Sequence, residues 1–219
     1  MPEGGVRAVF FDLDGTLADT APDLGGALNE LLAERGRPAL DMATLRPYVS
    51  AGTRGMLGIG FGLAPDHADY PDLARRFLEL YAARLCVGTR LFDGMTELLA
   101  QLERRGILWG VATNKPARFT EPLMDCLLLT ERMAAIVSGD SAPKPKPAPD
   151  MLLLACERSG VPPRLTLYVG DDLRDIQAAH AAGMRAIAAA WGYLGDGLPI
   201  SDWDADATIA TPLELLDLL

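Results

Sequence analysis

Short apolar runs alternate with segments of helical spacing along most of this chain, and that alternation sets its fold class. Four runs have the composition of buried strands, at residues 7–11, 107–113, 134–138 and 165–169. Weaker strand candidates follow at 186–190 and 207–210, and residues 212–219 form a closing helix pattern. Because alternating strands and helices build parallel sheets, we expect an α/β fold, a parallel Rossmann-like three-layer sandwich.

One long segment interrupts this alternation directly after the first strand. Between residues 20 and 87 there is no convincing strand, and apolar residues such as Leu24, Leu28 and Leu31 follow a helical period. We therefore expect an α-helical cap domain at 20–87, inserted into a core domain formed by residues 1–19 and 88–219. Small residues near Thr20 and at 87–89 are expected to form hinges between the two.

Composition limits the partners and the location of the protein. Apolar residues make up 49% of the chain and charged residues 23%, which predicts a soluble globular protein. The net charge of -10 argues against nucleic-acid and membrane partners. No apolar run is long enough to span a membrane, and no signal-peptide pattern is present, so we expect a cytoplasmic protein. We expect a small-molecule partner and a monomer or homodimer.

The cysteines and lysines are few, and each group supports one expectation. Cys86, Cys126 and Cys156 are odd in number and far apart, so we expect free thiols rather than a disulfide framework or a zinc site. Lys115, Lys144 and Lys146 are the only lysines in this acidic chain, and all three lie beside the motifs described next. They are expected to concentrate positive charge at an anion site.

Asp12 and Asp14 follow the first predicted strand in the sequence Asp-Leu-Asp-Gly-Thr-Leu. A backbone bend at Gly15 would direct both carboxylates toward one point. Carboxylates this close repel each other, and hard oxygen ligands are those that Mg²⁺ prefers, so the motif predicts a magnesium site. An acidic turn without function is the alternative.

Three further motifs also follow the ends of predicted strands. They contain Thr113 and Asn114 (residues 111–114), Lys146 (146–149), and Asp171, Asp172 and Asp175 (169–175). Ligands of open parallel sheets bind beyond the carboxyl ends of the strands, so we expect all four motifs to meet there. Individually, Thr113 has the alternative role of a helix cap and Asp175 that of a favourable helix-dipole charge, while Lys144 is a rival to Lys146.

The four motifs, in this order, resemble those of the haloacid dehalogenase-like hydrolase superfamily. The resemblance is strongest to phosphoglycolate phosphatase-like enzymes with a helical cap, and it extends to a subgroup that acts on N-acetylmuramic acid 6-phosphate. It implies a nucleophile at Asp12 that forms an aspartyl-phosphate, and a proton donor and acceptor at Asp14. It further implies phosphate contacts from Thr113, Asn114 and Lys146, Mg²⁺ bound by Asp12, Asp14 and Asp171, and supporting acceptors at Asp172 and Asp175.

The expected function is therefore Mg²⁺-dependent hydrolysis of a small phosphomonoester that carries a carboxylate. Phosphoglycolate is the first expected substrate and N-acetylmuramic acid 6-phosphate the alternative. Arg54, in a loop of small residues within the cap, is a candidate to bind the carboxylate, or else a solvated surface residue. Asp14 counts against a dehalogenase, which lacks this acid. A sugar-phosphate mutase and a non-catalytic binding module are the remaining alternatives.

Overall fold

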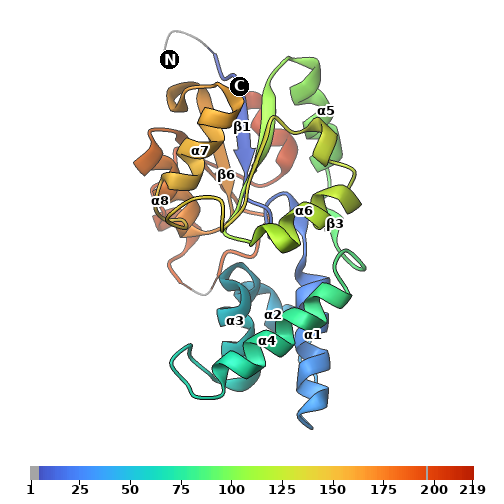
Figure 1. Ribbon diagram of the computed structural model, residues 1–219. Helices are drawn as coiled ribbons and strands as arrows, with labels where there is room; N and C mark the ends of the chain where they lie inside the picture. Colours follow the sequence, from blue (N-terminus) through green and yellow to red (C-terminus); the bar gives the residue numbers. More distant parts are fainter. Residues whose placement is uncertain (1–4, 196) are drawn as a thin grey trace.

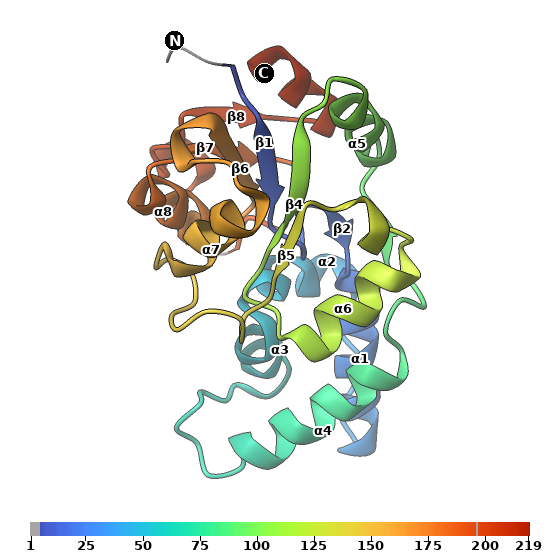
Figure 2. The same cartoon turned by 45° about the horizontal axis from the view of Figure 1, so that its top comes forward.

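A six-stranded parallel sheet forms the centre of the protein (Figures 1 and 2). The computed structural model describes residues 5–195 and 197–219. The strand order is β5-β4-β1-β6-β7-β8, and each neighbouring pair is parallel. The strands are β1 (Ala8–Phe11), β4 (Leu108–Ala112), β5 (Ala135–Val137), β6 (Thr166–Gly170), β7 (Arg185–Ala189) and β8 (Ala207–Ile209). Each overlaps a predicted run, so the parallel α/β fold is confirmed.

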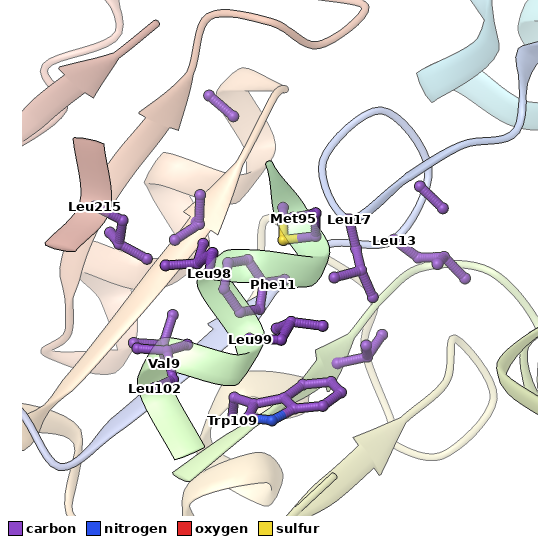
Figure 3. Packing of buried hydrophobic residues seen from close by; sticks show 14 of the residues in the cluster. Val9, Phe11, Leu13, Leu17, Met95, Leu98, Leu99, Leu102, Trp109 and Leu215 are labelled. Atoms are coloured by element: carbon purple, nitrogen blue, oxygen red, sulfur yellow. The ribbon is translucent and has the colours of Figure 1, made fainter. Parts of the chain in front are cut away.

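Successive residues of the central strand β1 pack into two cores, one on each face of the sheet. Val9 and Phe11 belong to one cluster, where Figure 3 shows Leu98 of α5 beside them. Ala8 and Phe10 belong to the cluster on the opposite face. The first face is covered by α5 (Met95–Arg104), α6 (Ala117–Cys126) and the 3-10 helix η5 (Pro212–Leu218), and the second by α7 (Asp150–Ser159) and α8 (Leu173–Ala182). The two-residue period of a strand produces this three-layer sandwich.

The predicted helical segment forms a third cluster beyond one end of the sheet (Figure 1). Its elements are α1 (Ala21–Glu34), α2 (Met42–Leu45), the 3-10 helix η1 (Arg46–Ala51), α3 (Gly52–Phe61) and α4 (Tyr70–Ala83). Leu24, Leu28 and Leu31 of α1 are buried with Phe77 and Leu80 of α4. The expected helical cap is present, and we keep that name for residues 20–87. The division into domains at 19/20 and 87/88 stays a prediction.

The two segments that connect core and cap are bonded to each other. The short strands β2 (Ala18–Asp19) and β3 (Arg90–Leu91) pair antiparallel. Asp23, fully buried at the start of α1, accepts hydrogen bonds from the backbone N–H of Gly88 at 2.8 Å and of Thr89 at 2.9 Å. The Thr89 hydroxyl donates to the same carboxylate at 2.7 Å. The predicted hinge segments are therefore held together by a buried carboxylate.

The expectation of three free thiols is wrong for two of the cysteines. Cys86, shortly after α4, forms a disulfide with Cys126, the last residue of α6. Cys156 is the buried free thiol. The bonded cysteines are 40 residues apart in sequence. They meet because the chain leaving the cap passes α6, which cysteine spacing does not reveal.

No helix in the described part of the chain is long and apolar enough to cross a lipid bilayer. The longest, α1 and α4, have 14 residues each.

Candidate active site

The register of three strands brings their following loops to one edge of the sheet. Phe11 of β1 lies opposite both Val111 of β4 and Val169 of β6. Asp12 follows Phe11 directly, and Asp171 lies two residues after Val169, directly after the end of β6. The Asp12 N–H donates to the Val169 carbonyl at 2.9 Å. Figure 1 shows β1 pointing toward the cap, so these loops lie between core and cap.

Three carboxylates and one ammonium meet at this edge. Oxygens of Asp12, Asp171 and Asp175 lie within 4.8 Å of one another. Lys146 Nζ lies 2.9 Å from Asp12 Oδ1 and 2.6 Å from Asp175 Oδ1, and donates to the Tyr168 hydroxyl at 2.8 Å. The structure thus brings Lys146 to Asp12, whereas Lys144 is exposed. In this group, the Lys146 ammonium is the single positive charge beside three carboxyl groups.

The excess of acids is reflected in their pKa values. Burial, together with the charges of Asp12 and Asp175, raises the pKa of Asp171 to about 8. Burial also raises the pKa of Asp175 to about 7, although Lys146 opposes this change. Burial alone would lower the pKa of Lys146, but Asp12 and Asp175 outweigh it and raise that pKa. The group is therefore short of positive charge.

A divalent cation fits this group of carboxylates. Oδ1 of Asp12 is buried, and no donor within residues 5–195 and 197–219 makes a hydrogen bond to it, despite the nearby Lys146 ammonium. Hard carboxylate oxygens with excess negative charge suit Mg²⁺. The predicted ligands Asp12 and Asp171 belong to the group, and Asp175, predicted only to support them, joins it. The Asp14 side chain is not part of the group, and its predicted contact with the metal stays a prediction.

Asp171 is fixed by residues from the core, the cap and a late loop. It accepts hydrogen bonds from the Thr16 hydroxyl at 2.8 Å, the Tyr193 N–H at 2.9 Å and the Ser50 hydroxyl of the cap at 3.0 Å. Gly15 lies so close that an added Cβ would be 2.2 Å from Asp171 Oδ2, and its φ of 88° also favours glycine. The glycine in the first motif is thus required by the position of Asp171.

Asp14 is held by a different lysine from the one that contacts Asp12. Lys115 Nζ donates to Asp14 Oδ1 at 2.9 Å and Oδ2 at 3.2 Å, and the Thr20 hydroxyl donates to Oδ1 at 2.5 Å. Burial would lower the pKa of Lys115, but Asp14 and Tyr81 raise it, so the ammonium is charged. The sequence predicts positive charge from Lys115 at an anion site, but not its pairing with Asp14. Its position directly after Asn114, in a chain with three lysines, was the available signal.

Thr113 and Asn114 occupy the loop after β4, as predicted, and Asn114 supports Lys146. Its Oδ1 accepts from the Lys146 N–H at 2.9 Å, and its Nδ2 donates to the Lys146 carbonyl at 3.2 Å. Thr113 is buried and accepts from the Lys115 N–H at 3.3 Å. The N-cap of α6 is Pro116, which excludes Thr113 as the cap of that helix. Substrate binding by Thr113 and Asn114 stays a prediction.

Asp172 and Asp175 cap helix α8, and each has its own cationic partner. Their side chains form a reciprocal capping box at the start of the helix. Asp172 accepts from Arg174 at 2.7 Å and 2.8 Å, whereas Asp175 pairs with Lys146. Arg174 also donates to the Ser50 carbonyl at 2.9 Å, which joins α8 to the cap. Sequence reasoning missed Arg174, because its cap contact is 124 residues away in the chain.

A cavity of about 290 Å³ lies beside these groups and has walls from both core and cap. Asp12, Asp14 and Lys146 line it, together with Arg118, which is exposed. Its apolar walls include Leu24, Val49, Phe77, Leu78, Tyr81 and Phe119. Arg54 is exposed and lines a neighbouring cavity of about 260 Å³, so the structure does not bring it to Asp12. Its predicted substrate contact stays a prediction.

Known proteins resemble this chain over nearly its whole length. The haloacid dehalogenase-like hydrolase family matches residues 9–189. An N-acetylmuramic acid 6-phosphate phosphatase of Pseudomonas putida is 44% identical over 210 residues, covering 96% of this chain and 94% of that protein. A phosphoglycolate phosphatase of Xanthomonas campestris pv. campestris is 46% identical over 210 residues, covering 95% and 94%. The crystal structure of a predicted phosphoglycolate phosphatase from Haemophilus somnus matches with a TM-score of 0.85 and 26% identity, covering 98% of each chain.

The parallel sheet, the helical cap and the aspartate cluster define an α/β protein with a buried anionic centre. The chain belongs to the haloacid dehalogenase-like hydrolase family. The predictions of the fold, of the family and of an enzyme of the hydrolase class are thereby confirmed.

Proposed function

We propose that this chain is a phosphatase that hydrolyses a small phosphomonoester through a covalent phosphate on Asp12. The supporting observation is the state of that carboxylate: it lines the cavity, its Oδ1 has no hydrogen-bond donor in the described residues, and an ammonium lies 2.9 Å away. An O–P bond forms to Asp12 as the ester O–P bond breaks, and water then cleaves the aspartyl-phosphate. Products are the alcohol and inorganic phosphate.

The other residues of the site have separate tasks in this reaction. Lys146 neutralises phosphate oxygens beside Asp12, and Asn114 holds its backbone in place. Asp14 gives a proton to the departing alcohol oxygen and later takes one from water. Mg²⁺, when bound by Asp12 and Asp171, supplies positive charge to the transferred phosphoryl group.

The size and lining of the cavity favour a substrate larger than glycolate. Its volume of about 290 Å³ and its apolar wall would leave a two-carbon leaving group with few contacts. A sugar ring with a lactyl carboxylate, as in N-acetylmuramic acid 6-phosphate, would contact Leu78 and Phe119 on that wall. We therefore propose N-acetylmuramic acid 6-phosphate ahead of phosphoglycolate, which the sequence alone had put first.

A panel of phosphate esters tests both levels of this proposal. Phosphate release is measured with N-acetylmuramic acid 6-phosphate, phosphoglycolate and glucose 6-phosphate, with Mg²⁺ and with EDTA. We expect the highest kcat/KM for the first ester and no turnover in EDTA. A higher value for phosphoglycolate would reverse the substrate order. Isomerised sugar phosphate without free phosphate would indicate a mutase and overturn the proposal.

We expect Arg118 rather than Arg54 to bind the substrate carboxylate. Arg118 lines the cavity and has no ion pair among the described residues, whereas Arg54 faces the neighbouring cavity. Arg118→Ala should lower kcat/KM for N-acetylmuramic acid 6-phosphate by ~10- to 100-fold, the usual value of a charge-assisted hydrogen bond. Glucose 6-phosphate, which has no carboxylate, should lose little.

Arg54→Ala is the matched control, because it removes the same kind of exposed side chain from the neighbouring cavity. A larger selective loss from Arg54→Ala than from Arg118→Ala would restore the assignment made from sequence. Equal losses on both esters would show that neither arginine reads the carboxylate.

A further inference from the structure

Lys115 is a buried cation in the cavity that the reaction described above does not use. Its side chain is 6% exposed, and its ion-pair partner among the described residues is Asp14. The backbone beneath it is fixed, since its carbonyl accepts from the Gly139 N–H at 2.8 Å and the Thr120 hydroxyl at 3.0 Å. A buried ammonium on a fixed backbone stays with its carboxylate, because leaving either charge unpaired is unfavourable.

An aromatic ring of the cap also contacts this ammonium. The Tyr81 ring of α4 has its centre 4.6 Å from Lys115 Nζ. Tyr81 itself is 1% exposed and packs on the Phe119 ring of α6, with centres 5.2 Å apart. Lys115 is thus enclosed by a carboxylate of the core and an aromatic ring of the cap.

The contacts on Asp14 leave one of its oxygens less occupied than the other. Oδ1 accepts from both Lys115 and Thr20, whereas within residues 5–195 and 197–219 the only donor to Oδ2 is Lys115. Because a carboxylate offers about two acceptor positions on each oxygen, one position on Oδ2 remains. That atom is suited to exchange a proton with a substrate oxygen in the cavity.

We propose that Lys115 is the positioning residue of Asp14: with Thr20 it holds the carboxyl group so that Oδ2 exchanges the proton, and Tyr81 of the cap keeps the ammonium in place. This inference rests on the proposed phosphatase function. Lys115 acts through Asp14 and makes no contact with the phosphoryl group.

The dependence of the rate on the leaving group distinguishes a positioning role of Lys115 from a purely structural ion pair. An alkoxide must be protonated as it leaves, whereas p-nitrophenolate leaves without a proton. Lys115→Met should slow the first step with N-acetylmuramic acid 6-phosphate, in which N-acetylmuramic acid leaves, by ~10- to 100-fold. This loss is a part of the rate enhancement that general acid catalysis usually provides. The rate of the initial burst of p-nitrophenolate from p-nitrophenyl phosphate should change less than about three-fold. The steady-state turnover after the burst should slow, because the attack of water on the aspartyl-phosphate also needs Asp14.

Two further variants make the test decisive. Lys144→Met, at an exposed lysine, should leave both rates unchanged. In an Asp14→Asn background, adding Lys115→Met should slow release from neither ester further, since the two residues act as one unit. This comparison also applies if the single variant fails to fold, because the pair removes both charges together.

Equal losses in the first step with both esters, or an added loss on top of Asp14→Asn, would overturn the positioning role and leave the proposed function standing. A wild-type protein that releases phosphate from neither ester would overturn the proposed function and this inference with it.

Discussion

The chemical role proposed for Asp12 opposes the stability of its surroundings in the metal-free protein. Three carboxylates share one ammonium, so removing the charge of Asp12 relieves repulsion with Asp171 and Asp175. Asp12→Asn should lower phosphate release by ~10³-fold or more, as expected when a nucleophile is removed. The urea midpoint of the metal-free protein should stay equal or rise. Near-normal phosphate release from a preparation free of deamidation would remove Asp12 from its role.

At the same scale, the sequence predicted the residues that chemistry requires and missed those that hold them. Asp12, Asp171 and Lys146 lie in short motifs after strands, and the structure brings all three together. The partners Lys115 of Asp14 and Ser50 of Asp171 are 101 and 121 residues away in sequence. Pairings over such distances depend on how the cap folds back, which local spacing does not contain.

At the scale of elements, the side chain of Asp23 holds together the two segments between core and cap. Asp23→Ala leaves the Gly88 N–H and the Thr89 N–H and hydroxyl without their buried acceptor. We expect the free energy of unfolding to fall by about 2–5 kcal/mol. Asp93→Ala, an exposed aspartate near β3, is the control and should change it by less than about 0.5 kcal/mol. Equal urea midpoints for the two variants would contradict this role of Asp23.

The sheet was predictable because strands of a parallel sheet are short apolar runs, and even β8 was found by its composition. The cap helices were predictable from their 3.6-residue period. The pair β2 and β3 was not, because two-residue strands carry no period. The Cys86–Cys126 disulfide was missed for a related reason, since its formation depends on where α4 and α6 meet.

Over the whole molecule, the positions of the charges determine the electrostatics of the candidate site more than the net charge does. The chain carries a net charge of -10, yet its three lysines include the two that pair with acids of the active site. The remaining deficit of positive charge lies with Asp171 and Asp175, whose pKa values are raised to about 8 and about 7. The pKa of aspartate in an unfolded chain is about 3.9. The metal-free folded protein therefore binds protons that the unfolded chain has already released.

This difference predicts how Mg²⁺ and pH together set the stability of the protein. Raised folded pKa values stabilise the metal-free protein below about pH 4, and that stabilisation is lost as pH rises toward 8. Mg²⁺ competes with those protons, so it should stabilise the protein little at pH 5 and strongly at pH 8. At pH 8 and a Mg²⁺ concentration of a hundred times its Kd, the free energy of unfolding should rise by about 2.7 kcal/mol. Urea unfolding with Mg²⁺ and with EDTA measures it at both pH values. Asp171→Asn should abolish the Mg²⁺ effect, and an equal effect at both pH values would contradict the predicted linkage.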